Sequence, residues 1–324
     1  MFYDGFPIYG VYFLWDEKYN IETRWCDVMK VRIVAYIKVS VSMIIFGSIG
    51  IFIRNIPLSS SAIAMFRALI GACFLLAISV IQRNKLSSRT LNKHLPGLLI
   101  SGAALGFNWI LLFESYRYTS VAVSTLCYYT APILVIFLSP VLLKEHLSRK
   151  KLACVIPTVL GMIFVSGVLT ASLGDSDWKG ILLGLGAAVL YAGVVILNKM
   201  QPELPSFDRT FFQLTTAAMV LLPYNLAVCG MPSVIPDSRA LLLMAVVGII
   251  HTGLAYYLYF SALPHLEGHS VAVISYVDPV VAVGVSVFLL HEKTSWQEML
   301  GALLILGASV ISELPCRMKA FYLD

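Results

Sequence analysis

The chain has 324 residues, of which 59% are hydrophobic and only 13% are charged, and its formal net charge is +5. Soluble globular domains carry about 25% charged residues, so the composition excludes a soluble protein. Apolar stretches of about 20 residues, enough to cross a bilayer, recur from Val34 almost to the C-terminus and leave no room for a separate soluble domain. The six cysteines form no CxxC pair and no zinc-type spacing, so they are interpreted as small packing residues.

The first 33 residues differ in kind from the rest. They mix aromatic residues with acidic ones, and the apolar run from Phe6 to Trp15 is too short to span a bilayer. A cleavable signal would begin with a basic region, whereas Asp4 is the only early charge. We therefore expect residues 1–33 to form an amphipathic or loosely ordered cytoplasmic extension. Met29 directly precedes the first span, so part of residues 1–28 is expected to reflect the choice of start site.

Hydropathy and polar breaks predict ten membrane spans, an all-α integral membrane fold. Helices are expected because backbone polar groups in lipid must be satisfied within each segment unless a barrel closes, and barrel strands would alternate in polarity. The predicted spans are 34–53, 61–81, 95–116, 119–143, 152–171, 180–198, 209–229, 240–263, 269–290 and 297–315.

The distribution of Lys and Arg predicts the orientation, because short cytoplasmic loops keep an excess of these residues. With the N-terminus inside, 17 Lys and Arg residues fall on the inner side and 5 on the outer side. Both termini are therefore expected in the cytoplasm, in a multi-pass protein of the cell (inner) membrane. The basic net charge is then a consequence of topology, and no nucleic-acid partner is expected.

The chain also contains an internal repeat. A shift of 147 residues, or one close to it, superposes similar residues: Phe113 on Phe260, Tyr129 on Tyr276, Pro132 on Pro279, Lys144-Glu145 on His291-Glu292, Phe46 on Tyr191, and Arg54 on Lys199. We assign residues 34–171 to the first copy, 180–315 to the second and 316–324 to a cytoplasmic tail. Each copy holds five predicted spans, and an odd number inverts the second copy relative to the first. Inverted repeats are typical of transporters, because the halves can exchange conformations around a midplane site.

Short motifs within the repeat resemble a known family. They are Tyr118-Thr119-Ser120-Val121-Ala122, Ala131-Pro132 and Leu143-Lys144-Glu145, echoed by Tyr276-Val277-Asp278-Pro279 and Leu290-His291-Glu292. With the span count, topology and duplication, they resemble the EamA-type transporters of the drug/metabolite transporter superfamily over residues 34–315. The resemblance implies ten helices, cytoplasmic termini, and export or uptake of amino acids, metabolites or toxic compounds. It leaves substrate and direction open.

Polar side chains at membrane depth are costly, so each is expected to be paired, buried or functional. On the third span, Ser101, Asn108 and Ser115 are spaced seven apart and share one helix face, which should point to the protein interior. Trp109 lies on a neighbouring face. Asn108 is a candidate for binding a solute or, alternatively, for a hydrogen bond between helices.

The fourth and ninth spans both carry polar or aromatic groups beside a proline. These are Tyr128 and Tyr129 before Pro132, and Ser275, Tyr276 and Asp278 before Pro279. A proline frees a backbone carbonyl one turn earlier, so two kinked helices with exposed backbone oxygens are expected at the bilayer centre. The two tyrosines, Ser275 and Tyr276 are therefore candidate substrate-binding residues, with a packing kink as the alternative.

Charged residues supply candidates for coupling or gating. Asp278 is the only carboxylate near the centre of a predicted span, so it is a candidate proton carrier or cation contact, or else a helix brace. Arg67 and Glu114 lie at similar depths, which favours a structural or gating ion pair; otherwise Arg67 would anchor a substrate carboxylate. On the eighth span, Tyr256 belongs to an aromatic face suited to a cavity. His251 lies on an apolar face of the same span. It is a candidate for a pH-sensitive gate or, alternatively, a packed residue.

These features predict a secondary transporter that moves a small neutral, zwitterionic or aromatic metabolite, amino-acid-like or drug-like, by alternating access. Export is the expected direction, with protons as the candidate coupling ion. Neither ATP nor another cofactor is expected, because there is no GxxxxGK[ST] loop, and an enzyme is disfavoured by the lack of HExxH and GxSxG motifs. A lipid-handling protein or a structural subunit of a membrane assembly is the alternative. The chain is expected to be a monomer or homodimer, with its cavity between the third, fourth, eighth and ninth spans.

Overall fold

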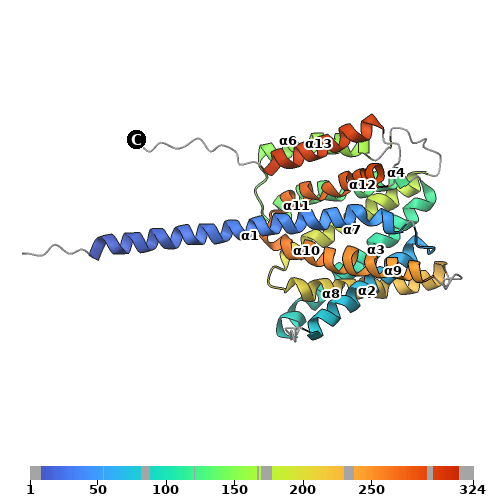
Figure 1. Ribbon diagram of the computed structural model, residues 1–324, viewed down its shortest axis with the longest axis horizontal. Coiled ribbons are helices and arrows are strands. Elements are labelled where there is room, and N and C mark those ends of the chain that lie inside the picture. Colours follow the sequence, from blue (N-terminus) through green and yellow to red (C-terminus); the bar gives the residue numbers. More distant parts are fainter. Residues whose placement is uncertain are drawn as a thin grey trace, which may run out of the picture.

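The structure is a computed structural model that describes residues 9–53, 55–81, 88–119, 121–165, 168, 177–229, 237–289 and 295–313. All regular elements in these ranges are helices, and they run side by side in a bundle (Figure 1). Three residues that the repeat relates to others, Arg54, His291 and Glu292, lie outside the described residues.

The two halves of the chain contain similar successions of helices. The first half consists of α1 (Tyr9–Ile53), α2 (Ser60–Ile81), α3 (Ser88–Tyr118), α4 (Val121–Tyr128), α5 (Ala131–Leu142) and α6 (Arg149–Val165). The second half consists of α7 (Asp177–Met200), α8 (Ser206–Tyr224), η2 (Asn225–Cys229), α9 (Ser238–Gly248), η3 (Ile249–Leu254), α10 (Ala255–Ala262), η4 (Leu263–His265), α11 (Gly268–Ser275), α12 (Val277–Phe288) and α13 (Trp296–Glu313).

Seven helical stretches in the described residues are long and apolar enough to cross a membrane. They are Met29–Ile53, Ser60–Ile81, Lys93–Tyr118, Val123–Leu142, Asp177–Met200, Ser206–Val228 and Ser238–His265. These seven stretches coincide with the first to fourth and the sixth to eighth predicted spans. The fifth, ninth and tenth predicted spans fall on the shorter helices α6, α11 with α12, and α13.

Of the two alternatives expected for the N-terminal extension, amphipathic or loosely ordered, the structure contradicts the loosely ordered one from Tyr9 onward. Residues from Tyr9 onward are helical and continue into the first span as one helix of 45 residues. No glycine or proline occurs between Val11 and Phe46, so the sequence contains no residue that would end the helix before the span. At 1.5 Å per residue the helix is about 68 Å long, more than the hydrocarbon thickness. Figure 1 shows its N-terminal part projecting beyond the bundle.

The fourth and ninth spans are each broken in the middle. In the first repeat, α4 ends at Tyr128 and α5 begins at Ala131; in the second, α11 ends at Ser275 and α12 begins at Val277. Each break lies directly before a proline, whose missing N–H cannot close the preceding turn. The two predicted kinks are therefore confirmed, and they lie at equivalent positions of the repeat.

The polar stripe of α3 faces its neighbouring helices. Asn108 Nδ2 donates to the carbonyl of Ala187 on α7 at 2.6 Å, and Ser115 Oγ donates to the carbonyl of Gly180 at 2.7 Å. Ser101 Oγ accepts a hydrogen bond from Gln213 of α8 at 2.6 Å. The stripe thus faces the interior, as expected, and it joins helices where hydrogen bonds have no competition from water.

Candidate functional site

A cavity of about 530 Å³ lies at the level of the two helix breaks. Helices α1, α2, α3, α4, α5, α7, α10, α11 and α12 contribute to its wall. Seven predicted site residues line it: Arg67, Trp109, Tyr128, Tyr129, Tyr256, Ser275 and Asp278. The four spans expected around the cavity are all present, and the first, second and sixth spans complete it.

Residues that the repeat relates to each other meet at this cavity. Trp109 of α3 and Tyr256 of α10 are 147 residues apart, and their rings lie edge to face with centroids 6.1 Å apart. Their side chains are also hydrogen-bonded. Tyr128 and Ser275, separated by the same interval, both line the wall. The cavity therefore lies where the two repeats meet.

Two charged groups break this symmetry. The guanidinium carbon of Arg67 lies 4.4 Å from the ring centroid of Trp109, and its buried Nε has no hydrogen-bond partner. Asp278 occupies the position that Ala131 holds in the first repeat, and its carboxyl is hydrogen-bonded to the side chain of Tyr129. No ion pair joins Arg67 to Asp278 in the described part of the chain. A cation and a carboxyl thus face one cavity from different repeats.

Helix α1 approaches very closely behind Asp278. A Cβ atom built on Gly47 would lie 2.7 Å from Cβ of Val281 and would also crowd the carbonyl oxygen of Asp278. Glycine is therefore required where α1 crosses the start of α12. This close approach sets the position of Asp278 in the cavity wall.

Four predicted site residues lie away from the cavity wall. Asn108 is bonded to α7, as described above. Tyr276 is 1% exposed, and its hydroxyl donates to the main-chain carbonyl of Tyr129 at 2.9 Å, so it braces the helix break. His251 lies in η3 with its Nε2 3.2 Å from Ser48 Oγ and its ring 4.7 Å from that of Phe52 on α1.

Glu114, the fourth of these residues, does not pair with Arg67 as the sequence suggested. Its carboxylate lies 3.0 Å from the guanidinium of Arg117 and accepts a hydrogen bond from the Tyr224 hydroxyl. Arg117 is three residues further along the same helix, which places the two side chains on adjacent turns. The Arg67–Glu114 ion pair is therefore replaced by a local pair, and Arg67 stacks on Trp109.

Several cavity residues were missed by sequence reasoning. They are aromatic side chains on the first, third and sixth spans: Phe46, Phe113, Tyr116 and Tyr191. The ring centroid of Tyr191 lies 5.7 Å from that of Tyr128, and the Phe46 ring lies 5.0 Å from Tyr256. The repeat superposes Phe46 on Tyr191, and this correspondence was the available signal.

Comparison with known proteins shows the family to which the chain is related. Residues 33–167 and 178–313 each match the description "EamA-like transporter family". "Uncharacterized transporter YxxF" of Bacillus subtilis (strain 168) is 30% identical over 288 residues, which cover 87% of this chain and 90% of the relative. "Protein PecM" of Dickeya dadantii (strain 3937) is 23% identical over 232 residues, 68% of this chain and 76% of the relative.

A solved structure titled "Crystal structure of protein" has the same fold, with a TM-score of 0.77 at 18% identity over 86% of this chain and 97% of the other. The family and the named relatives indicate a transporter and not an enzyme. The apolar helices and the twofold match describe a multi-pass membrane protein built from two repeats. The chain therefore belongs to the EamA-like transporter family.

Proposed function

We propose that the chain is a secondary transporter for a small solute of the zwitterionic or aromatic kind, such as an amino acid, and that this solute binds in the cavity between the repeats. The single observation that carries the proposal is the placement of Arg67 and Asp278 in one aromatic cavity without an ion pair between them. A volume of about 530 Å³ suits a small molecule, since such sites typically measure about 300–1,000 Å³.

The chemistry of the wall favours this solute class over others. The guanidinium of Arg67 is suited to a carboxylate, which it binds through two parallel hydrogen bonds. Asp278 and the faces of aromatic rings such as Tyr128 and Tyr256 suit an ammonium group, and the same rings offer apolar contact to an aromatic side chain. One cation cannot neutralise a polyanion, so nucleotides and sugar phosphates are disfavoured.

Alternating access requires the full architecture that the sequence predicts. We propose ten spans in two inverted five-helix repeats, with both termini in the cytoplasm and the protein in the inner membrane. The excess of Lys and Arg on one set of loops supports this orientation. Reporter fusions at both ends test it, and a terminus found on the outer side would contradict it.

Export coupled to protons is part of the same proposal. Asp278 lines the cavity and is hydrogen-bonded to Tyr129, so a proton on its carboxyl competes directly with a bound ammonium group. An inward-directed proton gradient would then drive solute out of the cell. Export is the proposed direction, since the family resemblance implies export or uptake and leaves the direction open.

Purified protein in liposomes tests the function directly. We expect counterflow of at least one amino acid, and lower or no counterflow of nucleotides, when both are tested at the same concentration. The panel should include nucleosides and cationic drugs, because the aromatic wall also suits them. Absence of flux for every solute, with and without an imposed pH gradient, would refute the proposal.

A further inference from the structure

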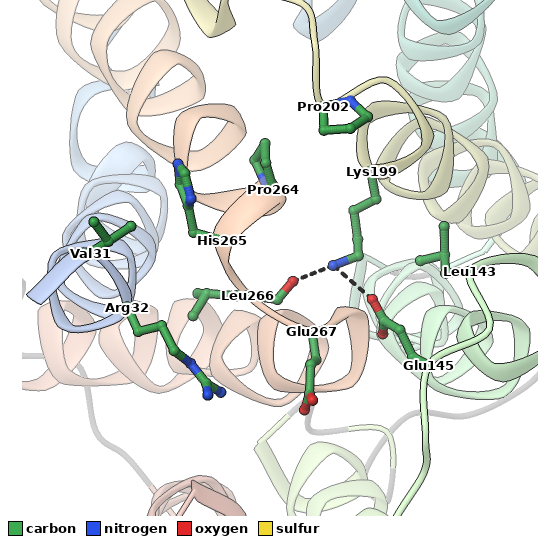
Figure 2. Close-up of a pocket in the computed structure, with 10 residues that line it drawn as sticks. All are labelled: Val31, Arg32, Leu143, Glu145, Lys199, Pro202, Pro264, His265, Leu266 and Glu267. Atoms are coloured by element: carbon green, nitrogen blue, oxygen red, sulfur yellow. Dashed lines mark hydrogen bonds and ion pairs between the residues drawn. The ribbon is translucent and has the colours of Figure 1, made fainter. Parts of the chain in front are cut away.

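A second cavity, of about 740 Å³, is lined by residues of α1, of the end of α7, of the segments that follow α5 and α7, and of the segment between α10 and α11 (Figure 2). Helix α1 contributes Val31 and Arg32 to this cavity and residues from Met43 onward to the central one. Arg32 and Met43 are eleven positions apart on the helix, a rise of about 16.5 Å along its axis. The two cavities therefore occupy successive depths of the same molecule, the second on the side proposed to be cytoplasmic.

An ion pair lies in the wall of the second cavity. Lys199 Nζ, at the end of α7, lies 2.9 Å from a carboxylate oxygen of Glu145, which follows α5, and the two side chains are only 7% and 16% exposed. The same Nζ donates to the carbonyl of Leu266 (Figure 2) and to that of Leu263. The other carboxylate oxygen of Glu145 accepts the N–H of Gly268 at 2.6 Å. One carboxylate thus joins the first repeat to two elements of the second.

Beside this ion pair, α5 and α11 cross with almost no space between them. A Cβ atom on Gly268 would lie 3.3 Å from Cβ of Ser139, and Ser139 is fully buried. A solute cannot pass between the two helices while they are this close. The crossing therefore closes this side of the central cavity.

The repeat provides an internal comparison for this crossing. A shift of 147 residues carries α4 onto α11 and α5 onto α12, so the pair α4 and α12 is equivalent to the pair α11 and α5. Helices α5 and α11 are packed together, whereas α4 and α12 have no extensive contact in the described residues. The central cavity instead extends to Ile53, at the C-terminal end of α1, and to Ser60, at the start of α2, on the side away from the second cavity. The two equivalent crossings are thus in different states.

We propose that Glu145 and Lys199 form the latch of an inner gate: their ion pair holds α5 against α11, and it must break whenever solute passes between the central cavity and the cytoplasm. This inference rests on the proposed function, because it assumes alternating access. Glu145 and Lys199 are positioning residues, since neither lines the central cavity. Another ion pair, between Lys93 and Glu203, is 68% and 64% exposed and is a suitable control.

A disulfide across the crossing tests whether it must open. The cysteines would be placed at Ser139→Cys and Gly268→Cys in a chain whose six native cysteines are replaced, and the 3.3 Å between the Cβ positions is close to the roughly 3.5–4.5 Å found in disulfides. We expect oxidation to lower counterflow about ten-fold or more, and reductant to restore it, because the closed crossing is then covalent. The control is the effect of oxidant on each single-cysteine variant: its flux, whatever its own level, should be the same with and without oxidant, since a single cysteine cannot form the cross-link. Cross-linked protein that transports at the reduced rate would overturn the proposal.

Thiol labelling tests the latch without any solute. The rate at which a membrane-impermeant maleimide, added from the inner side, labels Ser139→Cys reports how often the crossing opens. Lys199→Met and Glu145→Gln should each raise this rate about five-fold or more, and Lys93→Met should leave it unchanged. The glutamine keeps an acceptor for the N–H of Gly268, so Glu145→Gln serves if Lys199→Met does not fold. Equal rates in all the variants would refute the latch. Faster labelling in a protein that moves no tested solute would refute only the solute class.

Discussion

The hydroxyl of Tyr276 donates to the main-chain carbonyl of Tyr129 at 2.9 Å, and these tyrosines occupy equivalent positions in the two repeats, 147 residues apart. The same hydroxyl is hydrogen-bonded to the backbone of Ile133, four residues after Tyr129. It therefore lies between an N–H and a carbonyl that would pair with each other in an unbroken helix. Meanwhile the side chain of Tyr129 reaches Asp278 in the other repeat. Each helix break is thus supported by residues from the opposite repeat.

Replacing Tyr276 by phenylalanine should destabilise the fold. The variant leaves two buried backbone groups at the α4–α5 break without their partner, which typically costs about 1–3 kcal/mol. Unfolding of the purified protein by SDS should measure the loss. Tyr257→Phe is the control, since Tyr257 is half-buried and its ring packs on Phe207. Equal stability of Tyr276→Phe and the parent would show that the hydroxyl does not support the break.

Replacing Asp278 by asparagine should separate proton coupling from solute exchange. The amide keeps the shape and a hydrogen-bonding group for Tyr129 but cannot exchange a proton, so accumulation driven by a pH gradient should vanish while counterflow persists. Asp237→Asn is the control, because Asp237 caps α9 by accepting the N–H of Ala240 at 2.8 Å and asparagine caps equally well. A pH dependence in Asp278→Asn that matches the parent would rule out a coupling role.

Arg67→Gln should weaken binding of solutes that carry a carboxylate. Loss of a charge-assisted, two-pronged contact is expected to raise the half-saturation concentration about ten-fold or more. The methyl ester of the same amino acid should be affected much less, since it presents no carboxylate to the guanidinium. Competition in counterflow assays measures both. If acid and ester respond alike, Arg67 serves only to pack against Trp109.

Gly47→Ala should displace α12 and narrow the cavity at Asp278. The added Cβ would meet Val281 at 2.7 Å, and overpacking of this kind typically costs about 1–3 kcal/mol. Gly50→Ala is a matched control one turn later, because no atom lies within 4 Å of a Cβ there. Stability and counterflow should both fall for the first variant and be retained by the second. Equal behaviour of the two would mean that α12 adjusts freely to the added atom.

The exposed ion pair of Lys93 and Glu203 should add only a little to the stability of the fold, and this contribution should depend on pH. The hydrogen bond from Lys93 lowers the pKa of Glu203 below its ordinary value of 4.5. A depressed carboxyl pKa adds stability above the ordinary pKa, and this stability is lost as the pH falls through the lowered value. Any difference in stability between Glu203→Gln and the parent at pH 7 should therefore disappear in acid. A difference that persists below that range would have another cause.

The fold class, the repeat and the position of the helix breaks could all be predicted from the amino-acid sequence. In lipid the backbone must bond within each helix, so apolar length translates directly into spans. Pro132 and Pro279 lack the N–H that would bond the carbonyl one turn earlier, so local chemistry favours a break there, whereas Pro96 and Pro157 are accommodated inside the continuous helices α3 and α6. For the N-terminal extension the sequence left an amphipathic and a loosely ordered segment as alternatives, because its composition excluded only a complete span.

The sequence could not predict which polar residues meet in the cavity. Spacing along one helix shows that residues share a face, but it does not show which neighbour that face meets. Asn108 and Trp109 are adjacent in sequence, yet the first bonds to α7 while the second faces Arg67 in the cavity. Glu114 likewise forms an ion pair with Arg117 on its own helix and not with Arg67 on another helix. The latch between Glu145 and Lys199 required the same information, because it joins three elements that lie far apart in the chain.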